Sequence, residues 1–347
     1  MNIDHVHFYV EDAQVWRDWF VSHLGFTAVK TNIVSIHTRT EVVRSGVVCF
    51  LLSSALLPTS PVAEFLCQHP PGVADVAFAM EDVEGAMTLA QSQGARVIQP
   101  IQSQQCGDVS RKWGKIAGWG GLTHTLMENL PVKTDYAAKT TNHTFTAIDH
   151  IVLNVPVGEL ESAVAWYEKI LDFHPQQSFK IQTDRSGLHS QVMVSRQGGV
   201  QFPINEPASG NSQIQEFLDI NRGAGIQHIA LGTADLLSAI AQLRARGLSF
   251  LSVPQTYYSQ IQQRSGFPLS ISALEAIARQ KILVDWKEDT EDAVLLQIFT
   301  QPIFAEPTFF FEFIERRYQA QGFGEGNFRA LFHAIETEQI KRGTLQF

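Results

Sequence analysis

Apolar and polar positions along the chain follow a pattern that occurs once in each half. Residues 3–10 and 148–155 are both apolar stretches that carry Asp-His at their second and third positions. Each stretch reads as a β-strand and precedes a helical stretch that contains a pair of aromatic residues. Each helical stretch ends just before a phenylalanine, Phe26 in one case and Phe173 in the other. The pattern predicts a strand followed by a helix at the start of each half.

A second strand–helix pattern also occurs in both halves. Residues 72–78 and residues 225–231 each lead into a helical stretch. Gly94 and Gly247 end these stretches in equivalent places, where glycine favours the left-handed backbone of a helix C-terminus. Shorter β-rich segments occupy residues 42–52, 123–127, 191–194, 294–299 and 308–316. The chain therefore contains four similar units, each with a strand, a helix and further strands.

A polar segment with a proline, at about residues 129–144, separates the two pairs of units. Such a composition is typical of a linker. We therefore expect two domains, at residues 1–135 and 146–347, and an α+β fold class. In each domain, two units would form one open, curled sheet around a cavity.

The phenylalanine-rich stretch at residues 308–316 reads as a strand buried on both faces. Side chains alternate along a strand, so Phe309, Phe311 and Phe313 share one face and Glu312 lies on the other. An ionised carboxylate among apolar neighbours is costly unless it is paired or bound to a metal. Glu312 therefore indicates a nearby cation or a hydrated cavity.

His150 and His228 begin equivalent strands of the two C-terminal units, and Glu312 lies on a third strand. A sheet curled around a cavity could bring these three residues together. Two histidines and a carboxylate on one face of a metal are typical of non-haem Fe(II) oxygenases, which keep positions open for substrate and O₂. A structural zinc site would favour cysteines, and the C-terminal half has none. The sequence therefore predicts a metal site at these three residues.

The N-terminal half provides an internal comparison for this site. It keeps His5, but Asp75 stands at the position of His228 and Thr125 at that of Glu312. We therefore expect a metal site in the C-terminal half alone. Two alternatives remain open: the histidines could be hydrogen-bonded structural residues, and Glu312 could pair with an arginine.

Four polar residues are expected on strands that border the same cavity: Ser190, Asn205, Gln213 and Gln297. Gln297 interrupts an apolar strand, as Glu312 does, so its amide needs a buried partner. The other three could equally be surface or capping residues.

The end of the chain predicts an amphipathic helix after a glycine-rich segment at residues 322–326. Asn327 could cap its N-terminus, and Gly343 lies just past its end. Four apolar side chains have the spacing of one helix face: Phe328, Leu331, Phe332 and Ile335. The helix could simply pack on the domain, or it could act as a lid that excludes water, because it directly follows the Glu312 strand.

Composition narrows the classes of partner. The 347 residues are 44% hydrophobic and 18% charged, and the net charge is −9. These values are typical of a soluble globular protein and argue against nucleic acid or an anionic membrane as a partner. The sequence shows no leader pattern and no long apolar run, and its three cysteines have no CxxC spacing. We expect a cytoplasmic protein with reduced thiols and no membrane or nucleic-acid partner.

Six segments together carry a resemblance to a known family. They are Ile148-Asp149-His150, residues 223–231, Pro254-x-Thr256-Tyr257-Tyr258, residues 297–300, residues 310–316 and residues 322–328. In this order and spacing they resemble the 4-hydroxyphenylpyruvate dioxygenase family. The resemblance is close over the C-terminal half and looser over the N-terminal half, and the short connection at residues 316–322 is similar to bacterial members.

The resemblance implies the vicinal-oxygen-chelate fold, in which four βαβββ modules pair into two open-barrel domains and a lid helix follows. It implies Fe(II) as the cofactor, held by His150, His228 and Glu312. The implied pocket residues are Ser190, Asn205, Gln213, Gln297, Pro203, Phe299, Phe323 and Phe328. Of these, Phe299 and Phe328 would bracket the substrate ring.

The activity implied by the resemblance is conversion of the arylpyruvate 4-hydroxyphenylpyruvate and O₂ to homogentisate and CO₂. This reaction belongs to tyrosine breakdown and to quinone synthesis, and the family also implies a homo-oligomer, either a dimer or a tetramer. The nearest alternative is a 4-hydroxymandelate synthase acting on the same substrate; Pro203, Asn205 and Phe299 favour the homogentisate-forming enzyme. Two further alternatives are an extradiol dioxygenase, for which His189 would be a poor acid/base residue, and a non-catalytic metal-binding protein.

Overall fold

The computed structural model describes residues 1–30, 35–106, 109–129, 143–183, 186–287 and 293–344. Its N-terminal half begins with β1 (Asn2–Tyr9), α1 (Ala13–Leu24), β2 (Thr27–Val29), β3 (Thr38–Ser45) and β4 (Val48–Ala55). After α2 (Pro61–Gln68) come β5 (Gly72–Met80), α3 (Val83–Ser92), β6 (Val97–Cys106), β7 (Val109–Ala117), the 3₁₀ turn η1 (Trp119–Gly121) and β8 (Thr123–Asn129). Each of the two groups is a strand, a helix and three strands.

The C-terminal half repeats this sequence of elements. Its first module consists of β9 (Ala147–Asn154), α4 (Leu160–Leu171), β10 (Phe173–Gln182), β11 (Gly187–Ser195) and β12 (Gln201–Pro207). After α5 (Gln213–Asn221) come β13 (Gly225–Gly232), α6 (Leu236–Ala245), α7 (Gln255–Ile261), α8 (Ile271–Gln280), β14 (Leu283–Trp286), β15 (Val294–Phe299) and β16 (Phe310–Arg317). The chain continues with η2 (Glu325–Asn327) and α9 (Phe328–Arg342). The sequence pattern did not single out α7 and α8.

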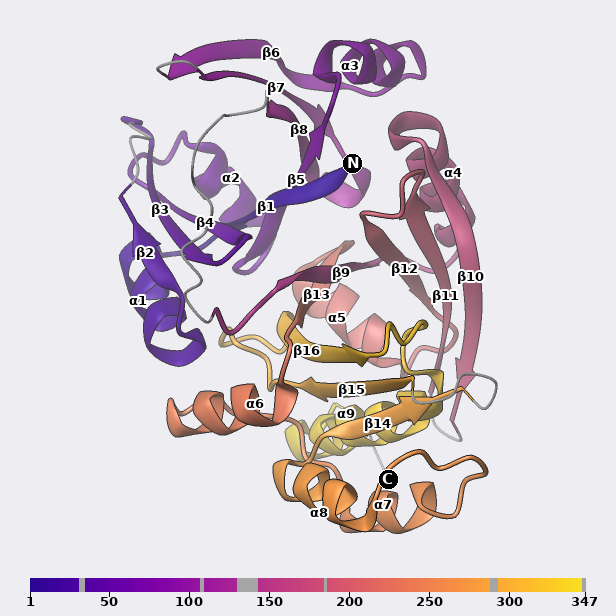
Figure 1. The fold of residues 1–347 in the computed structure, drawn as a ribbon. Helices are drawn as coiled ribbons and strands as arrows, with labels where there is room; N and C mark the ends of the chain where they lie inside the picture. Colours follow the sequence, from indigo (N-terminus) through magenta and orange to yellow (C-terminus); the bar gives the residue numbers. More distant parts are fainter. Residues whose placement is uncertain (31–34, 107–108, 130–142, 184–185, 288–292, 345–347) are drawn as a thin grey trace.

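Within the described residues, each half forms one sheet of eight strands (Figure 1). The strand orders are β2-β3-β4-β1-β5-β8-β7-β6 and β10-β11-β12-β9-β13-β16-β15-β14, so the same order occurs in both halves. In each sheet the first strands of the two modules pair in an antiparallel manner at the centre. The predicted α+β fold class, with four βαβββ modules in two curled sheets, is confirmed.

The helices that follow the central strands begin and end alike in both halves. Asp82 accepts a hydrogen bond from a backbone N–H in the first turn of α3, and Asp235 does the same for α6. Gly94 and Gly247 follow these helices with φ of +93° and +87°, a backbone conformation that only glycine adopts without strain. The predicted equivalence of the two helix ends is therefore confirmed.

Strand β16 separates the main hydrophobic core from the inside of the C-terminal sheet. Phe309, Phe311 and Phe313 are nearly fully buried on one side of this segment. Phe309 and Phe311 pack against the N-terminal half, where their ring centroids lie 5.1 Å from that of Phe8 and 6.0 Å from that of Phe20, respectively. Glu312 points to the opposite side, as the alternation predicts. A single strand therefore anchors the two halves to each other and presents the carboxylate to the cavity.

The final helix, α9, corrects one prediction and confirms another. The side chain of Asn327 does not cap the helix; instead its Oδ1 accepts a hydrogen bond from Tyr257 Oη at 2.7 Å. Asn327 has helical backbone angles, φ −95° and ψ −13°, and not the extended ones of a capping residue, and its buried amide bonds to the side chains of Tyr257 and Gln297. Gly343 ends α9 with φ of +79°, as predicted.

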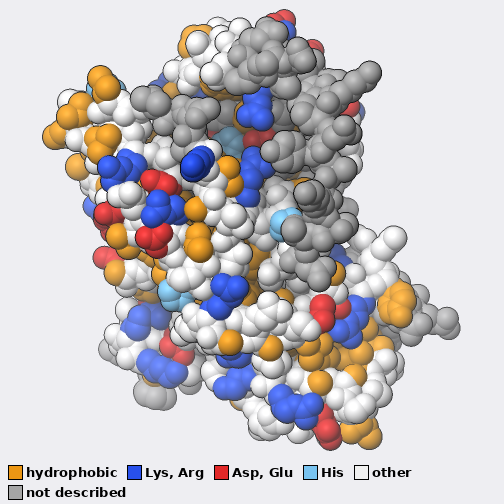
Figure 2. All heavy atoms as spheres, turned by 60° about the vertical axis from the view of Figure 1, so that its left-hand side comes forward, with side chains coloured by type: hydrophobic (Ala, Val, Ile, Leu, Met, Phe, Trp, Pro, Cys, Tyr) orange, Lys and Arg blue, Asp and Glu red, His pale blue; other side chains and the backbone are white. Residues whose placement is uncertain are grey.

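Three further observations concern the linker and the surface. The linker predicted at residues 129–144 lies mostly outside the described residues, so the division at residues 135 and 146 stays a prediction. No helix in the described part of the chain is both long and apolar enough to cross a membrane. On the face seen in Figure 2, acidic and basic side chains are interspersed among neutral and hydrophobic ones.

Candidate functional site

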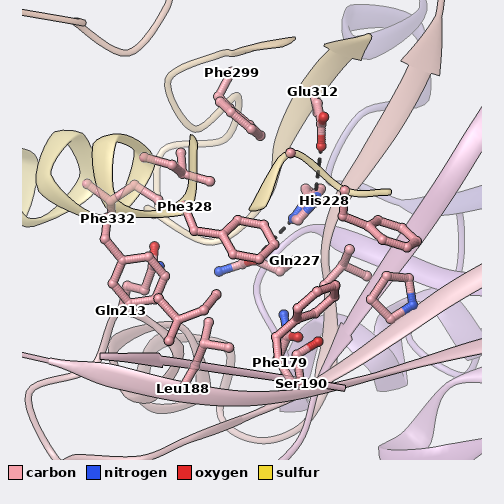
Figure 3. Close-up of a pocket in the computed structure, with 18 of the residues that line it drawn as sticks. Phe179, Leu188, Ser190, Gln213, Gln227, His228, Phe299, Glu312, Phe328 and Phe332 are labelled. Atoms are coloured by element: carbon pink, nitrogen blue, oxygen red, sulfur yellow. Dashed lines mark hydrogen bonds and ion pairs between the residues drawn. The ribbon is translucent and has the colours of Figure 1, made fainter. Parts of the chain in front are cut away.

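A cavity lies between the C-terminal sheet and α9 (Figure 3). All eleven residues predicted for the site line it: His150, Ser190, Pro203, Asn205, Gln213, His228, Gln297, Phe299, Glu312, Phe323 and Phe328. Residues far apart in the sequence thus meet around one space.

His150, His228 and Glu312 form the polar end of this cavity. The Nε2 atoms of His150 and His228 lie 3.2 Å and 3.6 Å from Glu312 Oε2. Two ligands bound at right angles to one metal ion stand roughly 3 Å apart, given metal–ligand distances of about 2.1 Å. Among the described residues, no other group of three His, Cys, Asp or Glu side chains converges in this way. The donor set and its spacing fit a divalent metal ion held on one face.

Two β-bulges, one in β9 and one in β13, place the side chain of each histidine next to the side chain of the residue before it. In the register of β9 and β13, Asp149 and Gln227 are the extra residues that face no partner. Neighbouring side chains of a regular strand point to opposite faces, whereas a bulge redirects one of them. Asp149 Oδ1 therefore lies 2.9 Å from His150 Nδ1, and Gln227 Oε1 lies 3.1 Å from His228 Nδ1. Donation from each Nδ1–H leaves each Nε2 free for a metal.

Gln297 orients the third member of the group. Its Nε2 donates hydrogen bonds to Glu312 Oε1 at 2.8 Å and to the Phe323 carbonyl oxygen at 3.0 Å. Its Oε1 accepts a hydrogen bond from Asn327 Nδ2 at 3.0 Å. The buried partner that the sequence requires for this amide is thus Glu312 itself. All three candidate ligands are held by a polar side chain behind them.

Electrostatics differ between the two histidines. Burial alone would lower the pKa of His150, but the Glu312 carboxylate and the hydrogen bond to Asp149 outweigh it and raise the pKa to about 9. Burial and the neighbouring His150 hold the pKa of His228 well below its usual value. Without a metal, one proton on His150 therefore balances the Glu312 carboxylate.

Gln213 corrects a secondary-structure prediction. It does not lie on a strand but begins α5, where Ser212 Oγ accepts a hydrogen bond from the N–H of Ile214 at 3.1 Å. The spacing of Ser212 and Gln215 is that of a capping box, a signal that the sequence contained. Gln213 Oε1 is buried and has no hydrogen-bond partner within the described residues. This acceptor is therefore available to a ligand in the cavity.

Sequence reasoning missed several residues that line the cavity. Most are apolar: Val152, Phe179, Ile181, Leu188, Val192, Ile214 and Phe310. Gln227 and Asn327 are the polar residues missed; Asn327 was expected only as a helix cap, whereas an amide directly before His228 in an apolar strand was a readable signal for Gln227. The apolar residues gave no such signal, because a cavity-lining side chain and a core side chain follow the same pattern.

The helix α9 closes the apolar end of the cavity. Phe328 and Phe332 reach in from α9 on the side opposite Phe179 and Leu188, which come from β10 and β11 (Figure 3). The ring centroids of Phe328 and Phe179 are 5.1 Å apart. Leu331 and Ile335 also line the cavity, so the predicted apolar face of α9 is the face turned towards it.

The N-terminal sheet confirms the predicted equivalences. Asp75 pairs with His7 as His228 pairs with Val152, and the register of β8 against β5 matches that of β16 against β13. Thr125 thus occupies the position of Glu312. No metal-binding group of three converges in the described part of this half.

A buried ion pair occupies the corresponding place in the N-terminal half. Lys115 Nζ lies 3.4 Å from Asp75 Oδ1, and Asp75 also accepts hydrogen bonds from Thr123 Oγ1 and Thr125 Oγ1 at 2.6 and 2.9 Å. Burial disfavours both charges, but their attraction lowers the pKa of Asp75 and raises that of Lys115. The ammonium group provides the positive charge that a metal would provide in the other half.

Comparisons with known proteins agree with this architecture. Residues 2–111 and 147–263 match the Glyoxalase/Bleomycin resistance protein/Dioxygenase superfamily. The chain is 36% identical to the 4-hydroxyphenylpyruvate dioxygenase of Caenorhabditis elegans and 38% identical to that of Yarrowia lipolytica, and both alignments cover 99% of this chain and 93% of the relative. A solved structure of a 4-hydroxymandelate synthase variant from Streptomyces coelicolor superposes with a TM-score of 0.84 at 29% identity, covering 97% of this chain and 98% of that one. The chain therefore belongs to the 4-hydroxyphenylpyruvate dioxygenase family, a family of enzymes within that superfamily.

Proposed function

We propose that this protein is an Fe(II)-dependent dioxygenase that converts 4-hydroxyphenylpyruvate and O₂ to homogentisate and CO₂. The observation that carries the proposal is the group of His150, His228 and Glu312 at one end of an apolar cavity. Three ligands on one face leave three positions of an octahedral ion open. Family membership supports the same reaction.

His150, His228 and Glu312 would hold the Fe(II), which would supply binding positions for the 2-oxo acid of the substrate and for O₂. The protein's own contribution begins with orientation. Each candidate ligand is held in one orientation by a hydrogen bond to a side chain behind it, from Asp149, Gln227 or Gln297. Removing such a partner typically weakens metal binding by about 10- to 100-fold.

The rest of the cavity would hold the aromatic ring and its phenol. Phe299 on β15 and Phe328 on α9 are the aromatic side chains proposed to bracket the ring. Gln213 Oε1, which is buried without a partner among the described residues, can accept a hydrogen bond from the phenol. Ser190 and Asn205 add polar atoms on β11 and β12. The Gln213 amide suits the binding of a phenol because it accepts the hydrogen bond without removing the proton.

Water exclusion would come from α9 and the loop before it. Phe323 lies against His150, with ring centroids 5.2 Å apart, and Phe332 is 2% exposed. Closing a site in this way protects reactive groups and strengthens the electrostatic interactions inside it. We propose that α9 opens for substrate entry and product release.

One alternative remains specific enough to test, namely hydroxylation of the side chain to give 4-hydroxymandelate. It is favoured by the similarity to a 4-hydroxymandelate synthase variant. Pro203, Asn205 and Phe299 lie in the wall of the cavity and favour homogentisate. Ring cleavage of a catechol is disfavoured, because His189 is absent from the lining of the cavity and its side chain is 42% exposed beside Glu206.

The test is anaerobic addition of 4-hydroxyphenylpyruvate to the Fe(II)-loaded protein, followed by O₂. We expect a weak visible charge-transfer band before O₂ and homogentisate after it; 4-hydroxymandelate as the main product would overturn the proposal. Glu312→Ala should lose iron and turnover while the protein stays folded. The matched control is Glu306→Ala, which changes an exposed carboxylate near the same strand.

A further inference from the structure

Arg316, at the end of β16, holds the carboxylate behind one candidate metal ligand. Its Nε and Nη2 donate hydrogen bonds to Asp149 Oδ2 and Oδ1, both at 2.7 Å. The same Oδ1 lies 2.9 Å from His150 Nδ1. The pair is mostly buried, with 19% and 13% of the two side chains exposed. A bidentate arrangement fixes the orientation of the carboxylate, and therefore that of the imidazole.

The remaining nitrogen of Arg316 binds the backbone that leads to the lid. Nη1 donates to the carbonyl oxygens of Ala320 and Gly322, at 3.0 and 2.8 Å. Between these groups and β16, Tyr318 and Gln319 have φ of +48° and +58°. Left-handed backbone at two consecutive non-glycine residues is strained and persists only where the surroundings enforce it. Arg316 therefore holds the turn from which the lid segment leaves.

A second connection runs from Glu312 to the same segment. Gln297 bonds at once to Glu312 Oε1, to the Phe323 carbonyl oxygen and to Asn327 Nδ2. Phe323 also packs on the ring of His150. Both ends of the metal-binding group are thus bonded to the base of α9.

We propose that Arg316 is a positioning residue that couples metal binding at His150 to closure of α9. The inference rests on the metal site of the proposed function. A metal on Nε2 of His150 restricts the imidazole, which orders Asp149, and Arg316 transmits this order to the carbonyl groups of residues 320 and 322. Because coupling between two equilibria is reciprocal, closure of α9 tightens metal binding by the factor by which the metal favours closure.

The test is hydrogen exchange of residues 320–335, with and without anaerobic Fe(II), in wild type and three variants. In the wild type we expect the metal to slow this exchange about tenfold or more. Arg316→Met should remove most of the slowing and weaken Fe(II) binding about 10- to 100-fold. Arg316→Lys keeps the charge next to Asp149 but cannot form the fork, so it should lose the slowing and weaken Fe(II) binding by no more than the lost coupling, about tenfold.

Arg317→Met is the matched control. Arg317 is the next residue and pairs with Glu315 at 2.7 Å, outside the cavity, so this variant should keep the metal-dependent slowing. The proposal is overturned if Arg316→Met or Arg316→Lys, folded by circular dichroism, keeps the full slowing. A failure of the proposed function would give a different result: if Glu312→Ala still binds Fe(II) as wild type does, the three residues are not the metal site. If Arg316→Met does not fold, the Arg316→Lys result decides.

Discussion

The buried ion pair of the N-terminal half gives a quantitative test of how that half replaces a metal. Asp75 is 1% exposed, and Lys115, 21% exposed in its side chain, is its charged partner. Lys115→Met leaves a buried carboxylate with hydroxyl donors alone, and Asp75→Asn leaves an uncompensated ammonium. Removing one partner of a buried pair costs about 3–5 kcal/mol, whereas replacing both by neutral groups is close to neutral. Partial exposure of Lys115 favours the lower figure, about 3 kcal/mol for each single change.

The double variant makes this reasoning refutable. If the charges compensate each other, Asp75→Asn combined with Lys115→Met should be close to neutral, and should therefore destabilise the protein by about 6 kcal/mol less than the sum of the single changes. Urea unfolding of the four metal-loaded proteins, followed by circular dichroism, measures each free energy of unfolding. Effects that add to within about 0.5 kcal/mol would refute the compensation. Iron content should stay near one per chain in all four proteins, because the pair lies outside the C-terminal cavity.

Three further predictions concern the cavity and its lid. Because the pKa of metal-free His150 is raised to about 9, Fe(II) binding near pH 7.5 should release about one proton, and the affinity should fall roughly tenfold for each pH unit below 9. Calorimetry in two buffers measures the number of protons released, and binding without proton release would contradict the raised pKa of His150. Gly324→Ala should lower kcat/KM at least about tenfold in steady-state assays and leave Fe(II) bound. The reason is that Gly324 has a φ of +76° and that a Cβ added there would collide with Gln297. A variant with wild-type kcat/KM would contradict this prediction. Glu336→Gln weakens two 2.7 Å hydrogen bonds to Thr183 and Ser186 and should raise KM several-fold; unchanged hydrogen exchange in α9 would exclude a lid effect.

Local pattern alone determined much of the architecture. The two repeated strand–helix patterns predict four modules, and alternation places Glu312 opposite Phe309, Phe311 and Phe313, as the structure confirms. Internal repetition also aligned the two halves correctly, so that Thr125 falls at the position of Glu312. These inferences succeed because strand alternation and helix caps depend on neighbouring residues, which the sequence shows directly.

Tertiary structure decided the details that give the site its chemistry. The bulges at Asp149 and Gln227 depend on the register between β9 and β13, and no local pattern states which residue will be left over. Gln297 could be recognised as needing a partner, but its bonds to Glu312 and to the base of α9 require strands and a helix from different parts of the chain. Lys115 reads as an ordinary strand lysine until folding buries it beside a carboxylate. Contacts between distant segments fix orientation and charge balance, and these are properties of the fold rather than of any segment.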